Sequence, residues 1–226
     1  MDYALNPYSG CEHGCIYCYA PGFVHADLSE WRVVKVKRNI PNRLAKELPS
    51  VDGIIGIGTV TDPYQYAERK FMLTRSCLEV IRDRHREIHM HTKSDLIIRD
   101  IPILQDIKGK TGITITTLDD RISRITEPGA PLPSARLRTL SELVSADVCC
   151  YALLAPVMST LNGHEKEMME ALADTGVSVV YLDPLNTRHV DTSRLDRMGI
   201  TSSKMAVDRL VEEGRKLGLD MFPVFD

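Results

Sequence analysis

Three cysteines near the start of the chain offer its clearest chemistry. Cys11, Cys15 and Cys18 have C-x3-C-x2-C spacing, and Gly10 and Gly14 allow the tight backbone turns that would bring the three thiolates together. Soft sulfur ligands suit iron–sulfur clusters. Three thiolates can bind three irons of a cubane, which leaves the fourth iron open to a substrate or a cofactor.

A structural zinc site is the alternative interpretation of the same loop, with His13 or His25 as the fourth ligand. Zinc knuckles usually pair two C-x2-C elements, and the sequence has no second pair. The spacing favours a cluster and leaves zinc open. A disulfide framework is the weakest alternative, because we expect a reducing, cytoplasmic location.

Composition limits the class of protein. The chain has 226 residues, of which 43% are hydrophobic and 26% charged, with a formal net charge of −3. These values predict one globular domain, residues 1–226, and do not favour a nucleic-acid partner, although local contacts leave one open. Met1–Gly10 lacks the pattern of a signal peptide, and no apolar run reaches the ~20 residues of a membrane span. We therefore expect a cytoplasmic protein without a membrane partner.

Short apolar runs alternate with segments of helical period, which indicates a parallel sheet covered by helices. The expected strands are Asp2–Leu5, Asp52–Val60, Glu87–Thr92, Gly112–Thr117, Asp147–Leu154 and Val177–Leu182. The expected helices are Asn42–Leu48, Arg69–Arg86, Leu96–Ile107, Ser134–Ser145, Thr160–Thr175 and Ser203–Leu217. Six units are too few for a closed eight-stranded barrel, so the sequence predicts an α/β fold, an open partial (β/α)6 barrel with parallel strands. In such folds the chemistry gathers at the carboxyl ends of the strands.

Beyond the spacing, the cysteine loop and its flanks resemble a known family. Asn6-Pro7-Tyr8 leads into the cysteines and Tyr19-Ala20 follows them, as in the radical S-adenosylmethionine (SAM) superfamily and its branch similar to spore photoproduct lyase. The resemblance continues in order through Gly58–Gln65, Leu73–Arg75, Thr92–Ser94, Ile115–Asp119, Glu127-Pro128 and Ala155–Val157.

This resemblance implies an enzyme with a [4Fe–4S] cluster on Cys11, Cys15 and Cys18. The open iron would bind SAM, and an electron from a donor such as flavodoxin or ferredoxin would cleave it. A 5′-deoxyadenosyl radical would then abstract hydrogen from a substrate that the sequence does not identify. The whole chain would be a single radical SAM domain, and no residue is assigned as its acid, base or hydrogen donor.

The resemblance also suggests where SAM would bind. Thr59, Thr61 and Asp62 would meet its amino group, although Asp-Pro is also a common turn. Lys93 would pair with its carboxylate, with a solvated lysine as the alternative. Other candidates are the ribose-facing Thr116 and Thr117, a carboxylate-pairing or merely exposed Arg136, and Tyr17 and Tyr19, which would pack on adenine or serve the core.

Other features carry weaker expectations. His89 and His91 share strand parity with Lys93, so all three should project the same way, as core residues or toward a substrate. Structural roles are expected for Cys77, Cys149 and Cys150. The strip Arg32, Lys35, Lys37 and Arg38 suggests a solvated edge, and Asp183–His189 is placed for a substrate or adenine.

One departure from the photoproduct branch limits what is carried over. That branch needs a hydrogen-returning cysteine near its second strand, and this chain has Thr59 there. DNA repair is therefore not transferred, and nucleic-acid modification stays an alternative within the enzyme class. A non-catalytic zinc- or iron–sulfur-binding module is the alternative outside it.

Overall fold

Parallel strands form the centre of the molecule. The structure, a computed structural model, describes residues 1–224, and within them one sheet has seven strands in the order β1-β4-β5-β6-β7-β8-β9. Every neighbouring pair in it is parallel. The strands are β1 (Tyr3–Leu5), β4 (Ile55–Ile57), β5 (Ile88–Thr92), β6 (Gly109–Thr114), β7 (Cys150–Val157), β8 (Val179–Pro184) and β9 (Asp220–Pro223). A separate antiparallel pair joins β2 (Tyr8–Ser9) to β3 (Lys35–Val36).

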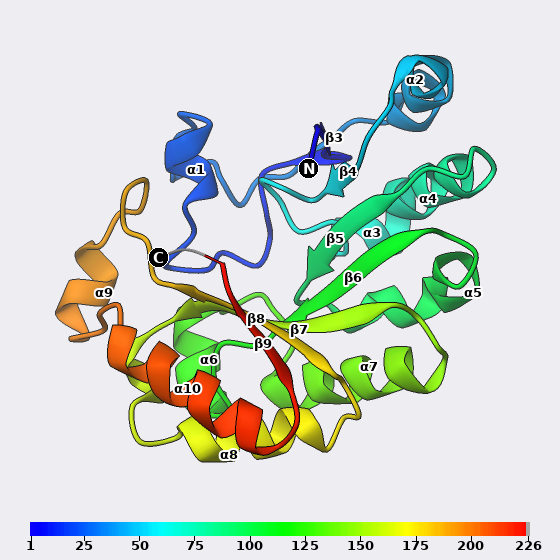
Figure 1. Cartoon of the computed structure of the whole chain (residues 1–226). Helices are drawn as coiled ribbons and strands as arrows, with labels where there is room; N and C mark the ends of the chain where they lie inside the picture. Colours follow the sequence, from blue (N-terminus) through cyan, green and yellow to red (C-terminus); the bar gives the residue numbers. More distant parts are fainter. Residues whose placement is uncertain (225–226) are drawn as a thin grey trace.

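Helices connect the strands and cover the outer face of the curved sheet, where Figure 1 shows α4, α5, α7, α8 and α10. The α-helices are α1 (Ala20–Phe23), α2 (Ile40–Glu47), α3 (Ala67–Phe71), α4 (Leu73–Arg82), α5 (Ile101–Leu104), α6 (Asp120–Thr126), α7 (Pro133–Ser145), α8 (Glu165–Ala173), α9 (Ser193–Arg197) and α10 (Lys204–Lys216). The 3-10 helices are η1 (Leu48–Ser50), η2 (Asp95–Asp100) and η3 (Ser159–Leu161). In the part of the chain that the structure describes, no helix has both the length and the apolar character needed to span a membrane.

The two faces of the sheet are packed differently. In β5, Ile88, Met90 and Thr92 are buried, whereas His89 and His91 between them are only half-buried. The buried set belongs to the main core, which apolar faces of the outer helices complete. The other side of the sheet therefore keeps polar side chains accessible.

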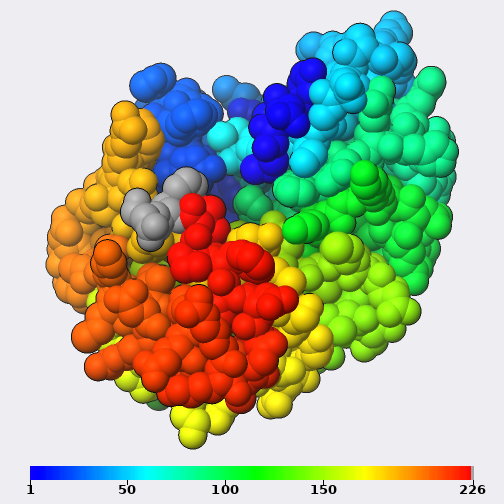
Figure 2. Space-filling view, in the orientation of Figure 1, coloured from blue at the N-terminus to red at the C-terminus, as the bar shows by residue number. Residues whose placement is uncertain are grey.

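The predicted fold class is confirmed as an open, parallel α/β sheet of a partial barrel. The edge strands β1 and β9 do not pair with each other, and Figure 2 shows a recess between the N-terminal residues and the C-terminal strand. All six predicted strands exist. The prediction missed β2, β3 and β9, because two-residue strands and a four-residue strand that ends in Pro223 carry little sequence signal.

Several predicted boundaries were wrong. The strands predicted over Gly112–Thr117 and Asp147–Leu154 lie three residues earlier and later, as β6 and β7. The helix predicted over Arg69–Arg86 divides at Met72, whose backbone is left-handed with φ 49°. A new helix, α4, begins after Met72, because the Glu68 carboxylate accepts the N–H groups of Thr74 and Arg75 in its first turn.

Two more predicted helices are interrupted. The segment over Leu96–Ile107 forms η2 and then α5, which starts at a residue before Pro102. The segment over Thr160–Thr175 forms η3 and α8, with Gly163 at φ 83° between them. The short helices α1, α6 and α9 were not predicted.

Candidate active site

The cysteine loop, residues 10–18, lies against the ends of several strands. Gly10 and Gly14 have φ values of 87° and 59°, as the sequence predicted for a loop that must turn tightly. The Cys11 N–H donates to the Trp31 carbonyl at 3.0 Å. On the far side, the Ile16 N–H donates to the Thr126 carbonyl at 2.9 Å, so the loop is attached to the end of α6 as well.

A buried amide side chain attaches the loop to the segment after β4. The Gln65 Oε1 accepts the Glu12 N–H at 2.9 Å, and its Nε2 donates to the Gly10 carbonyl at 3.2 Å. The Thr61 hydroxyl donates to the same carbonyl at 2.6 Å. Thr61, predicted to bind SAM, is therefore occupied in supporting the cysteine loop.

Asp62, predicted as an acceptor for the SAM ammonium, is also fully engaged with protein groups. Its Oδ1 accepts the Thr92 hydroxyl at 2.6 Å, and its Oδ2 accepts the Lys93 N–H at 2.9 Å and lies 3.3 Å from the His13 Nδ1. Burial alone would raise the pKa of this carboxyl, but His13 and the donated hydrogen bonds outweigh burial and lower it. Asp62 joins the cysteine loop to the end of β5 and stays ionised there.

The three cysteine thiols are partly or fully buried and close enough to influence one another. Burial raises the pKa of the Cys11 thiol to about 12, with the Asp62 carboxylate adding to the rise. Burial likewise raises the pKa values of Cys15 and Cys18, and the Lys93 ammonium opposes the rise in both. Such thiols give up their protons only to a compensating positive charge, such as that of bound metal.

Lys93 lies beside these thiols, at the carboxyl end of β5. Its ammonium is 5.7 Å from the centre of the Tyr17 ring. Burial disfavours the charge on Lys93, but Cys15 and Glu127 outweigh burial and raise its pKa. The solvated lysine considered from the sequence is not what the structure shows, because Lys93 is half-buried among these groups.

A buried carboxylate that the sequence analysis gave no role, Glu127, organises the opposite wall. It forms an ion pair with Arg136 and accepts hydrogen bonds from the hydroxyls of Tyr17 and, at 2.9 Å, Thr116. Burial opposes its charge, but Arg136 and Lys93 lower its pKa, so Glu127 is ionised. The sequence showed Glu127 only as part of a Glu-Pro pair, and no spacing rule reveals such a network.

Three predicted SAM contacts are thus placed within the Glu127 network instead. Arg136 is 1% exposed, so the alternative of an exposed helical arginine is wrong. Its guanidinium also donates to the Pro131 carbonyl at 2.7 Å. Tyr17 and Thr116 are buried with their hydroxyls directed at Glu127. Thr117, another predicted SAM contact, lies beyond the end of β6, where its hydroxyl accepts the Asp119 N–H at 3.0 Å.

Thr59 and Tyr19 remain the more accessible candidates. The Tyr19 hydroxyl donates to the Thr59 carbonyl at 2.5 Å, and the Thr59 hydroxyl accepts from the Asn6 amide at 3.0 Å. The Tyr19 side chain is 48% exposed, so it serves no core. Thr59 lies just after β4, and Tyr19 follows Cys18 in the chain and lies close enough to its thiol for the two to interact electrostatically.

The inner face of the sheet continues the site toward β9. His89 pairs in register with Lys110 and His91 with Gly112, and the half-buried pattern agrees with a common direction for both histidines. The Lys110 ammonium lies 3.4 Å from the Tyr181 hydroxyl. Tyr181 stacks on Phe222 at 5.3 Å and meets Tyr151 edge-on at 4.9 Å. Sequence reasoning missed this aromatic row, which joins residues of three strands.

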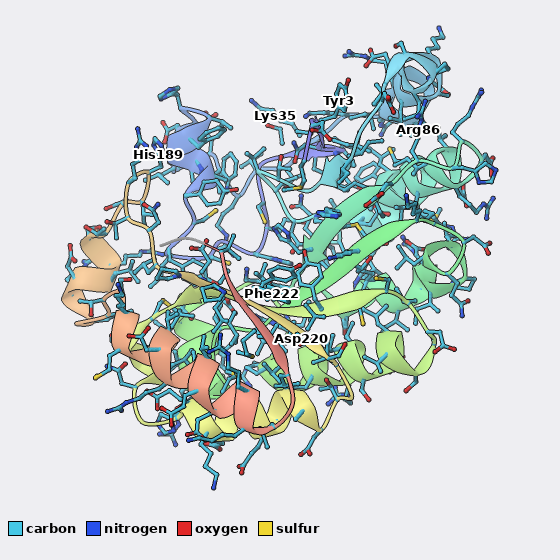
Figure 3. All side chains as sticks on the ribbon, viewed as in Figure 1. Tyr3, Lys35, Arg86, His189, Asp220 and Phe222 are labelled. Carbon is cyan, nitrogen blue, oxygen red and sulfur yellow. The ribbon has the colours of Figure 1, made fainter. Side chains whose placement is uncertain are left out.

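The remaining sequence candidates lie outside this centre. Cys77 is fully buried in α4, as expected, but Cys149 is exposed just before β7 and is no core residue. The segment after β8 reaches α1, where the His189 ring meets Phe23 edge-on at 5.9 Å (Figure 3). Asp183 at the end of β8 has its pKa raised by burial.

The two histidines considered as zinc ligands differ in their surroundings. His13 is 3% exposed and directs its Nδ1 at Asp62, whereas the exposed His25 lies beyond α1. Among residues 1–224, no three side chains of His, Cys, Asp or Glu are grouped around one point that a single ion would fill. A cubane places each thiolate on its own iron, and three neighbouring buried thiols beside a lysine suit that arrangement.

The fold and the site together define a class: a parallel α/β partial barrel with a cysteine loop at the carboxyl ends of its strands. The chain belongs to the radical SAM superfamily, whose family model matches residues 5–173. The protein is therefore a radical SAM enzyme, and its subtype is open.

Relatives and solved structures agree with this assignment. An uncharacterised protein of Methanocaldococcus jannaschii is 28% identical over 93% of this chain and 83% of its own length. An uncharacterised protein of Mycobacterium tuberculosis is 30% identical over 82% of this chain, which spans 59% of that relative. Spore photoproduct lyase complexed with dinucleoside spore photoproduct has a TM-score of 0.70 at 14% identity over 96% of this chain and 75% of its own. Streptococcus suis SuiB bound to S-adenosylmethionine has a TM-score of 0.64 at 12% identity, covering 99% of this chain and 47% of its own.

Proposed function

We propose that this enzyme holds a [4Fe–4S] cluster on Cys11, Cys15 and Cys18 and uses it to cleave SAM reductively. When bound, the cluster would supply one electron to SAM, and the cleavage would yield methionine and a 5′-deoxyadenosyl radical able to abstract hydrogen from a substrate. The observation that carries the proposal is the position of Lys93, a half-buried ammonium beside Cys15, Cys18 and the ring of Tyr17.

The chain's own residues have distinct tasks in this proposal. Lys93 balances the negative charge of the thiolates and of the SAM carboxylate. Tyr19 would offer its accessible ring, and Thr59 its carbonyl, to the nucleoside of SAM. Glu127 fixes the hydroxyl of Tyr17 and the guanidinium of Arg136, so the latter two support the wall of the site.

The proposal leaves the substrate class open. One structural neighbour is complexed with a dinucleoside photoproduct, and another, SuiB, with a precursor peptide. We propose that the substrate approaches the inner face of the sheet, where His89 and His91 lie on the same side as Lys93. We also expect a cytoplasmic protein. It should be sensitive to oxygen, because an iron without a protein ligand is open to oxidants.

Anaerobic reconstitution tests the proposed function. Protein given iron, sulfide, dithionite and SAM should turn brown and release 5′-deoxyadenosine and methionine. Cys15→Ala should lose both the iron and the product, whereas Cys150→Ala, which removes a half-buried thiol from β7, should keep both. Colourless protein that retains one zinc ion would refute the proposal.

A further inference from the structure

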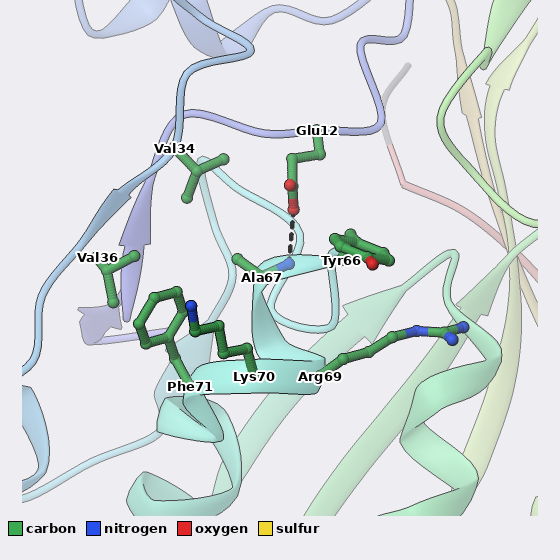
Figure 4. A pocket seen from close by; sticks show the side chains of 8 residues that line it. All are labelled: Glu12, Val34, Val36, Tyr66, Ala67, Arg69, Lys70 and Phe71. Atoms are coloured by element: carbon green, nitrogen blue, oxygen red, sulfur yellow. Dashed lines mark hydrogen bonds between the residues drawn. The ribbon is translucent and has the colours of Figure 1, made fainter.

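A groove of about 430 Å³ lies outside the site described above, between α3 and the chain leading into β3. Figure 4 shows the lining side chains Tyr66, Arg69, Lys70 and Phe71 of the α3 region, with Glu12 bonded to Ala67. The lining contains no cysteine and neither Lys93 nor Tyr17. We call it the α3 groove.

Positive charge and aromatic rings gather at this groove. The Arg38 guanidinium and the Lys70 ammonium lie 5.6 Å and 5.4 Å from the centre of the Phe71 ring, and the Arg69 guanidinium lies 5.8 Å from that of Tyr66. All three cations are exposed, and none forms an ion pair with any residue between 1 and 224. Lys35 (labelled in Figure 3) and Lys37 alternate with the groove-lining Val34 and Val36 and do not line the groove. In a chain of net charge −3, this is a local excess of positive charge.

The groove also borders the cysteine loop directly. Glu12 follows Cys11 in the chain, and its carboxylate accepts the Ala67 N–H at 2.6 Å, while its own N–H donates to Gln65. These bonds join the start of α3 to the loop. A partner seated in the groove would therefore touch the residue next to a cluster ligand without entering the site.

We propose that the α3 groove is the docking surface for an acidic electron-carrier protein of the flavodoxin or ferredoxin class. The inference rests on the function proposed above and names the partner that function needs. One electron leaves the reduced carrier, which is thereby oxidised by one electron, and reduces the cluster; no atom is transferred. A carrier needs only proximity, whereas a nucleic-acid substrate would have to present its reacting atom on the Lys93 side.

Binding measured without turnover tests the docking surface. Reconstituted protein is titrated with purified flavodoxin by calorimetry at low and at high ionic strength. The double substitution Arg69→Glu with Lys70→Glu should raise the Kd about tenfold and reduce its dependence on salt. The matched control, Lys204→Glu with Arg215→Glu on the exposed side of α10, makes the same charge change away from the groove and should keep the wild-type Kd.

Activity with two reductants separates this inference from the proposed function. With dithionite, both double variants should release 5′-deoxyadenosine as wild type does, and with reduced flavodoxin only the groove variant should be slow. Normal dithionite activity with an unchanged flavodoxin Kd would overturn the docking surface alone. A groove variant that binds flavodoxin as wild type does, but no longer binds a single-stranded oligodeoxynucleotide, would also overturn the docking surface. Failure of dithionite to drive cleavage in wild type would instead overturn the proposed function.

Discussion

Among single residues, Glu127 is the one at which a small substitution should lower the free energy of unfolding most. Glu127→Gln keeps the shape and the hydrogen bonds to Tyr17 and Thr116 but removes the charge that pairs with Arg136. Because a buried guanidinium would then be unpaired, we expect the free energy of unfolding to fall by about 3 kcal/mol in urea titrations. Glu47→Gln, which breaks the exposed pair with Arg43, should cost less than about 0.5 kcal/mol. Equal losses in the two variants would contradict this account of the network.

A second residue-scale prediction concerns pH. Burial, helped by Lys93, lowers the pKa of His91 to about 4, below the ~6.5 of an unfolded histidine. Its neutral form therefore stabilises the folded chain above about pH 6.5, and this contribution is lost as the pH falls toward 4. Relative to His91→Gln, wild type should lose about 1–2 kcal/mol of unfolding free energy between pH 7 and pH 5. Urea titrations at both pH values measure this loss. The control variant His164→Gln changes an exposed histidine and keeps His91, so its loss should equal that of wild type.

At the scale of elements, Gln65 tests how the cysteine loop is held to the segment after β4. Gln65→Leu leaves the Glu12 N–H and part of the Gly10 carbonyl without partners in a buried place. We expect a loss of about 1–3 kcal/mol in unfolding free energy and faster hydrogen exchange of the Glu12 amide. Gln105→Leu removes an amide that is exposed and makes one hydrogen bond, so it should change neither quantity much. A Gln65 variant with unaltered exchange at Glu12 would refute the role of this contact.

Elements also show where sequence reasoning reaches its limit. The alternation of strands and helices was readable because each strand face and helix face repeats its apolar residues at a fixed period. The position of the cysteine loop was readable because three thiols and two glycines are local in the chain. Thr61, Asp62 and Arg136 were assigned to SAM because their types suit it. The structure gives them protein partners, such as Gly10 for Thr61 and Glu127 for Arg136, and such pairs leave no periodic signal in the sequence.

For the whole molecule, the question is whether the cysteine-bearing segment and the sheet unfold together. Trp31 is the single tryptophan of the chain, is 7% exposed and packs with Cys11 and Ala20, apart from the main core. It therefore reports on this segment, while far-ultraviolet circular dichroism reports on the sheet and its helices. The bonds from Gln65, Asp62 and Thr126 to the loop cross between the two parts.

If the chain is one domain, as proposed, tryptophan fluorescence and circular dichroism of the reduced, metal-free protein should give the same urea midpoint. Fluorescence that changes at lower urea would instead identify the cysteine segment as a separate unit. Reconstitution with iron and sulfide should raise both midpoints together, because a metal that binds only the folded chain stabilises everything that unfolds with its site. A rise in the fluorescence midpoint alone would show that the contacts of Gln65, Asp62 and Thr126 with the loop do not couple the site to the sheet.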